Sequence, residues 1–193
     1  MDTWVWIVIV AAVVVVAAAV AWGALRARRT RTLREGFGPE YDRALEDHGD
    51  RRAAEEELRK RRDRRRGLDI RPLAPEARER YARRWTVTQR RFVDEPEGAV
   101  AEAHDLVVRV MRDRGYPVDD FEQRAADVSV DHPETVEHYR QAHAISVDSA
   151  LGHASTEDLR KAMVHFRALF DDLLHDGPHG ARDRRARQME EMS

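Results

Sequence analysis

An uncharged stretch of 23 residues near the N-terminus constrains this chain more than any other feature. Thr3–Leu25 reads TWVWIVIVAAVVVVAAAVAWGAL, and Arg26 follows it directly. An apolar run of about 18 or more residues is long enough to cross a bilayer as a helix. Trp4 and Trp22 lie 18 positions apart. On a helix this is about 27 Å of rise, so both indoles would reach a membrane–water boundary. The sequence therefore predicts a transmembrane helix.

Two alternatives to an uncleaved anchor remain open for this stretch. A secretory signal has a basic n-region, an apolar core of about 7–15 residues and a small-residue cleavage site. Here Met1–Thr3 contains an acid and no base, and the apolar run is longer, although AAAVAWGA offers small residues for cleavage. The other alternative is a helix buried in a soluble core. Length and flanking residues favour the anchor.

Arginines gather on one side of the stretch, whereas only Asp2 precedes it. The positive-inside rule places the basic flank in the cytoplasm. We therefore expect the N-terminus outside the cell and the C-terminal domain in the cytoplasm. The residues expected at the membrane interface are Trp4, Trp6, Trp22, Arg26, Arg28, Arg29, Arg31 and Arg34.

The composition excludes several kinds of site. The chain has no cysteine, so it has no disulfide, thiolate nucleophile or cysteine-based zinc or iron–sulfur centre. The net charge of −2 conceals an uneven distribution. Residues 26–66 contain 15 basic and 10 acidic residues, whereas the residues after Gly67 contain 19 basic and 25 acidic residues. The basic part thus adjoins the predicted membrane span.

The segment after the basic flank reads as a charged helical stalk. Two glycines and a proline at residues 36–39 predict a turn that ends the first helix. From Pro39 to Arg66 the chain is highly charged, with a predicted break at His48-Gly49-Asp50. Three consecutive i,i+4 acid–base pairs begin at Glu55 and favour a helix. Its apolar residues are too few for a core, which indicates a solvated stalk, or a weak coiled coil if the protein dimerises.

Beyond a Pro- and Gly-containing linker at residues 67–75, apolar residues recur at helical spacing. The pattern predicts four or five helices, with capping boxes at Asp94/Glu97, Asp131/Glu134 and Ser155/Asp158. No window alternates with a period of two, so we expect no sheet. The aromatic residues expected in the core are Tyr81, Trp85, Phe92, Phe121, Tyr139, Phe166 and Phe170.

The predicted fold class is therefore all-α, with a transmembrane helix, a charged helical stalk and a four- to five-helix bundle. We expect four regions: a membrane anchor with its basic flank at 1–34, the stalk at 35–66, the bundle domain at 67–175 and a disordered polar tail at 176–193.

The nine histidines are the main candidates for chemistry. His132, His138 and His143 lie close in sequence, but no Glu-x-x-His repeat of a bundle di-iron site accompanies them. His143 falls on an apolar stripe, which predicts a hydrogen-bonded core histidine. Neither a glycine-rich phosphate loop nor GxSxG is present. We expect no catalytic residue, metal or cofactor, although a crevice lined by His143 and Tyr139 leaves a cryptic enzyme open.

A second basic run lies at the end of the stalk and forms a possible polar partner surface. It comprises Arg59, Lys60, Arg61, Arg62, Arg64, Arg65 and Arg66. Such runs can bind phosphates. This one lacks interleaved aromatic residues for base stacking and follows acidic residues closely, which disfavours nucleic acid as its partner.

Several segments resemble an uncharacterised actinobacterial family whose members are usually labelled hypothetical or secreted proteins. They are FGPEYDRALEDHGDRRAAEEEL, LDIRPLAPEARERY, RFVDEPEGAVAEAHDLV, RGYPVDDFEQRAADVSVDHPETVEHYR and DLRKAMVHFRALFDDLL. The resemblance spans most of residues 36–175. It implies one defined domain and brings no activity, cofactor or catalytic residue.

These observations together predict a single-pass, membrane-anchored helical protein that acts as a non-enzymatic interaction or scaffolding module. Its expected partners are the lipid bilayer and another protein, or a second copy through the stalk. No small-molecule ligand is evident from the sequence. The alternatives are an exported helical domain released by signal cleavage, and a membrane-proximal nucleic-acid binder or cryptic enzyme.

Overall fold

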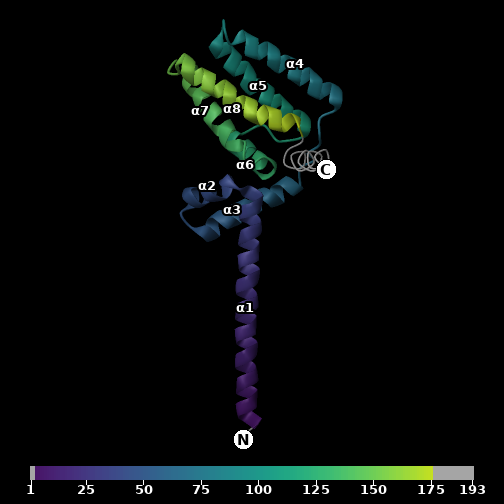
Figure 1. Ribbon diagram of the computed structural model, residues 1–193, viewed down its shortest axis with the longest axis vertical. Coiled ribbons are helices and arrows are strands. Elements are labelled where there is room, and N and C mark those ends of the chain that lie inside the picture. The colour runs from purple at the N-terminus through teal and green to yellow at the C-terminus, as the bar shows by residue number, and fades with distance from the viewer. Residues whose placement is uncertain (1–2, 176–193) are drawn as a thin grey trace, which may run out of the picture. The chain divides into compact units, whose positions relative to one another are not determined.

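Eight helices and no strand make up residues 3–175, the part of the chain that the computed structural model describes (Figure 1). The prediction of an all-α fold is confirmed. These residues divide into two compact units between Leu58 and Arg59. The helices are α1 (Thr3–Phe37), α2 (Pro39–His48), α3 (Arg51–Arg66), α4 (Pro75–Arg91), α5 (Pro96–Arg114), α6 (Phe121–Asp131), α7 (Val136–Ala150) and α8 (Thr156–Leu174).

Within the described residues, no helix meets the length and apolarity that a membrane crossing requires. The predicted span, Thr3–Leu25, includes residues 3, 5, 7–12, 15 and 19, whose side chains lie outside the description. The transmembrane part of the predicted fold is thus not supported by the described residues and remains a prediction. The tail predicted at 176–193 also lies outside them.

The first unit turns twice, each time at a glycine with positive φ. Gly38 has φ 47° and precedes Pro39, which occupies the first turn of α2. Gly49 ends α2 with φ 62°, and its N–H donates to the carbonyl oxygen of Leu45. Glycine adopts this left-handed conformation without the steric cost of a Cβ. The break predicted at residues 48–50 is therefore confirmed.

A buried carboxylate lies in this first unit. The Oε1 atom of Glu55 accepts hydrogen bonds from the Thr30 hydroxyl at 2.8 Å, the Tyr41 hydroxyl at 3.3 Å and Arg51 Nε at 3.1 Å. Burial by itself would raise the pKa of Glu55, but the three donors outweigh it and lower the pKa. Glu55 is thus held as a carboxylate.

The segment predicted to be a solvated stalk has buried side chains. Its residues Tyr41, Ala44, Ala54 and Leu58 are at most 3% exposed, as are Leu33 and Phe37 at the end of α1. The apolar residues within 39–66 alone predict too little buried surface, because Leu33 and Phe37 of α1 are buried as well. The expectation that the segment has too few apolar residues to bury is wrong.

The second unit contains the bundle. Helices α4 and α5 form a hairpin, α7 and α8 form another, and α5 lies between α4 and α8 (Figure 1). Five of the predicted core aromatics, Tyr81, Trp85, Tyr139, Phe166 and Phe170, are buried in one apolar cluster. The other two, Phe92 and Phe121, are partly buried and pack against it.

Gly115 ends α5 with φ 98° and lies against the lead-in to α4. A Cβ at this position would collide with the carbonyl oxygen of Asp69, so the close approach requires glycine. Next to it, the N–H of Arg71 donates to the carbonyl oxygen of Arg114 at 2.9 Å. The segment predicted as a linker is therefore bonded to the end of α5.

Of the three predicted capping boxes, only that of Ser155 and Asp158 is present. At α5 the N-cap residue is Glu95, and no side chain caps it; its carboxylate pairs with Arg91 instead. At α7 the N-cap is Thr135, again without a side-chain cap bond. Asp131 belongs to α6 and accepts from Tyr116 at 2.6 Å. Those two capping predictions are wrong: α5 begins one residue later than Asp94 would cap, and Asp131 is bonded to Tyr116 instead.

Truncation of the core should measure its packing. Phe166 is fully buried, so Phe166→Ala should lower the free energy of unfolding by about 3–5 kcal/mol. Denaturant unfolding of the full-length chain, followed by circular dichroism, checks this. Val87 on α4 is 61% exposed, and Val87→Ala serves as the control, with a change of about 0.5 kcal/mol or less. An equal effect of the two substitutions would contradict the core assignment.

Candidate functional site

The predicted interface residues with described side chains lie exposed along α1. Trp4, Trp6 and Trp22 are 60–72% exposed. Of the arginines, Arg31 pairs with Glu35 at 2.7 Å and Arg34 pairs with Asp42 at 2.9 Å. The remaining members are Arg26 and Arg28, which are exposed, and Arg29, whose side chain lies outside the description.

The second basic run, Arg59–Arg66, forms the end of α3, and part of it lies against α6. Arg65 pairs with Asp131, the same carboxylate that accepts from Tyr116. Burial raises the pKa of Tyr116, and the Asp131 charge adds to this effect. The pair is about three-quarters buried at each side chain, so it is screened less than a surface pair.

Asp127 of α6 gives the same run a second carboxylate. Its side chain is buried and accepts from Gln123 Nε2 at 3.0 Å. Burial raises the pKa of Asp127, while Gln123 and the charges of Arg64 and Arg61 oppose the shift. Two acids of α6 therefore attract the basic run, which makes part of the predicted polar partner surface an intramolecular contact.

A histidine–carboxylate pair joins the end of α6 to α8. His132 Nδ1 lies 2.7 Å from Asp172 Oδ2, which also accepts from the Thr135 hydroxyl at 2.9 Å. Burial alone would raise the pKa of Asp172, but His132 and Thr135 lower it. His132 Nε2 is buried and has no hydrogen-bond partner among the described residues.

His143 is held by ring stacking. Its ring lies 3.6 Å from that of Phe121, nearly parallel at 16°, and 5.8 Å from that of His104. Its Nδ1 is buried without a hydrogen-bond partner within residues 3–175, so the predicted hydrogen bond is not made at that atom. Phe121 also lies 5.2 Å from the Tyr139 ring, so it contacts both residues of the predicted crevice, which remains a prediction.

The histidines do not assemble a metal site within the described part of the chain. His138 and His165 lie with their Nδ1 atoms 2.9 Å apart, but no group of three or more His, Asp or Glu residues converges there or elsewhere in that part. Burial lowers the pKa of His104, His143 and His165 below the ordinary value of 6.5. The charge of Arg124 adds to this for His104 and His143.

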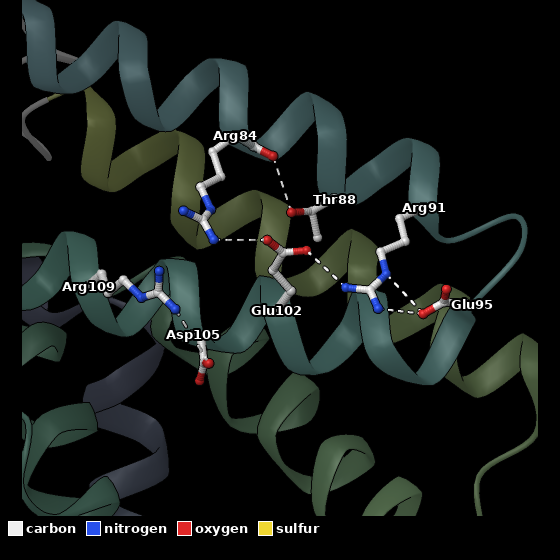
Figure 2. Close-up of polar contacts among 7 residues, drawn as sticks. All are labelled: Arg84, Thr88, Arg91, Glu95, Glu102, Asp105 and Arg109. Carbon is white, nitrogen blue, oxygen red and sulfur yellow. Dashed lines mark hydrogen bonds and ion pairs between the residues drawn. The ribbon is translucent and has the colours of Figure 1, made fainter.

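Ion pairs cross the surface between α4 and α5. Figure 2 shows the carboxylate of Glu102 reaching Arg84 on one side and Arg91 on the other, at 3.4 and 3.7 Å. Arg91 also pairs with Glu95, and Arg109 lies 3.7 Å from Asp105. Exposed pairs of this kind contribute about 0–1 kcal/mol each. The two pairs at Glu102 join α4 to α5, whereas the pair of Arg109 and Asp105 lies within α5.

One polar group that the sequence analysis overlooked lies between α4 and α8. Arg167 donates to the Gln89 side chain at 3.0 Å, pairs with Asp171 at 3.0 Å and stands over the Trp85 ring at 5.9 Å. In the sequence, Gln89 and Arg167 each lie at helical spacing beside apolar residues. This spacing does not indicate that their two helices lie side by side, so the contact could not be predicted.

Comparison with models of protein families, with curated proteins and with solved structures found no match to this chain. The function must therefore be argued from the residues and their arrangement.

The lowered histidine pKa values predict a loss of stability on mild acidification. Because the unfolded chain takes up these protons near pH 6.5 and the folded chain does so only at lower pH, the free energy of unfolding should fall from about pH 7 to pH 5. The lowered pKa of Asp172 acts in a separate, more acidic window, below its ordinary value of 3.8.

The measurement is denaturant unfolding of the full-length chain at several pH values. The double variant His104→Gln/His143→Gln should reduce the dependence between pH 7 and 5 to the part that His165 contributes, whatever its stability at pH 7. His153 is exposed, so His153→Gln should leave the slope unchanged. A wild-type slope that persists in the double variant would contradict the assignment to these two rings.

Proposed function

We propose that this chain is a single-pass membrane protein that holds a helical interaction module at the cytoplasmic surface and catalyses no reaction. The observation that carries the proposal is that α1 exposes apolar side chains that no other part of the described chain covers. Val13, Val14, Val16 and Val20 are 60–66% exposed. Contiguous exposed apolar surface marks a membrane or partner contact. It argues against the alternative of a helix buried in a soluble core.

The length and the flanking residues of Thr3–Leu25 favour a membrane over a protein partner as the surface that α1 contacts. The run contains no charge over 23 residues, and tryptophans stand near both ends. Inside a bilayer, backbone groups must be hydrogen-bonded within the segment, which a continuous helix achieves. The arginines from Arg26 to Arg34 would then lie among anionic headgroups, each contributing about 1 kcal/mol.

The module part of the proposal rests on the remaining helices. They are apolar within and rich in charge outside, which suits a scaffold that presents surfaces. Nucleic acid stays disfavoured as a partner, since the Arg59–Arg66 run lies against Asp127 and Asp131 of its own chain. The resemblance to the actinobacterial family remains part of the proposal and adds only the expectation of one defined domain.

Charges placed in the apolar stretch should prevent membrane insertion. An arginine at the centre of a spanning helix costs about 2.5–3.5 kcal/mol, so Val13→Arg/Val16→Arg should release the protein from alkaline-washed membranes. The control is Val87→Arg/Val93→Arg, which adds the same charge at two exposed positions outside α1 and should leave the protein in the membrane fraction. Release of the wild type, or retention of the α1 variant, would refute the anchor.

Orientation and cleavage need separate measurements. A fusion after Ser193 should be active with a cytosolic reporter and inactive with a periplasmic one, because the basic flank stays inside. The opposite result reverses the topology. N-terminal sequencing of the membrane-bound protein should begin within Met1–Thr3; a start beyond Ala19 would favour the exported, cleaved alternative.

A further inference from the structure

A groove of about 310 Å³ runs along the surface between α4 and α8. Both helices pack against α5, and they contact each other through Trp85 and Phe170. The wall from α4 is formed by Trp85, Gln89 and Phe92, spaced i, i+4 and i+7. On a helix these positions share one face and span two turns, about 10 Å. The groove is thus an elongated feature built on regular helices.

The facing wall comes from α8 with a matching period. Met163 and Val164 lie at its middle, and Arg160 and Arg167 lie one turn to either side. The floor is rigid, because Trp85 and Met163 are at least 92% buried and the Trp85 ring stacks on Phe170 at 4.6 Å. An apolar middle thus has a cation at each end.

The charge of the groove is one-sided. Two guanidinium groups and one amide line it, and no carboxylate is among the lining residues. Arg160 pairs with Glu157 at 2.7 Å and Arg167 with Asp171 at 3.0 Å. These pairs are about half exposed at each side chain, and such pairs contribute at most about 1 kcal/mol. A ligand anion would compete with Glu157 for Arg160, and with Asp171 and Gln89 for Arg167, and each exposed ion pair that it displaces is worth at most about 1 kcal/mol.

The size of the groove decides between a protein and a small molecule. A stable protein interface buries about 800 Å² on each partner and involves about 20–30 residues a side. Seven residues line this groove, too few for such an interface. Its volume matches the lower end of small-molecule sites, about 300–1,000 Å³.

We infer that the α4–α8 groove binds a medium-chain carboxylate, with the alkyl chain over Trp85 and Met163 and the carboxylate on Arg167 or Arg160. The apolar floor takes the chain by the hydrophobic effect. The planar guanidinium donates two parallel hydrogen bonds to a carboxylate, which a single point charge does not. Binding at this site is independent of the membrane anchor, so failure of one proposal leaves the other standing.

The test uses the full-length chain in phosphatidylcholine nanodiscs, with empty nanodiscs to subtract partition into lipid. Dodecanoate should bind saturably at one site per chain. Dodecanol, which has the same alkyl chain without the charge, should bind about ten- to a hundredfold more weakly, as expected for loss of a hydrogen bond to a charged group. This comparison needs no substitution, so misfolding cannot affect it.

Two variants locate the site. Arg160→Ala/Arg167→Ala should bring dodecanoate binding down to that of dodecanol, whereas Arg83→Ala/Arg90→Ala, with the same change in net charge on exposed residues outside the groove, should keep the difference. Val164→Trp should fill the groove and weaken both ligands at least about tenfold. Val87→Trp is its control at another exposed valine.

Equal binding of dodecanoate and dodecanol, or binding no greater than to empty nanodiscs, would overturn the inference. Unchanged binding in Val164→Trp would do the same by placing the ligand elsewhere. If dodecanoate fails to bind and Val164→Trp instead lowers self-association of the chain, the groove belongs to a second copy, and the inference is again overturned.

Discussion

The bundle depends on the burial of α5, whose apolar residues contact three other helices at once. Val100, Leu106, Val107, Val110 and Met111 are at most 1% exposed, and the helix packs against α4, α7 and α8. Each Å² of apolar surface removed from water contributes roughly 25 cal/mol, whereas an exposed ion pair contributes at most about 1 kcal/mol. Although 36% of the chain is charged, its fold therefore rests on a small number of apolar side chains. The ion pairs between α4 and α5 add little to a packing that the apolar side chains of α5 already stabilise.

What the sequence could predict was local. The helices of the second unit, the turn at Gly49 and the capping box at Ser155 each depend on residues a few positions apart. Most of the core aromatics followed from the same helical periodicity. The transmembrane assignment rests on local apolarity as well, and it stays a prediction together with orientation and partners.

What the sequence could not predict depends on residues far apart in the chain. Glu55 is buried because Thr30 and Tyr41 donate to it across 25 and 14 positions. Asp131 does not cap α7 because its carboxylate is bonded to Tyr116 and to Arg65, and Arg65 lies 66 positions away in the sequence. The groove also depends on residues far apart in the chain, since α5, α6 and α7 lie in sequence between the two helices that line it. Spacing along one helix shows which face is apolar, but the partner of that face is set by tertiary packing.

The contact at Gly115 bears on the order in which the second unit folds. The lead-in at Asp69 and Arg71 has no helix of its own and is bonded to the last turn of α5. Since that turn exists only once α5 has ended in the left-handed conformation, we expect the α4–α5 hairpin, a pairing of neighbours in sequence, to form first. The lead-in would then close over it as a late event. A side chain at Gly115 would collide with the Asp69 carbonyl oxygen, so we expect it to disfavour this last contact and leave the hairpin able to form.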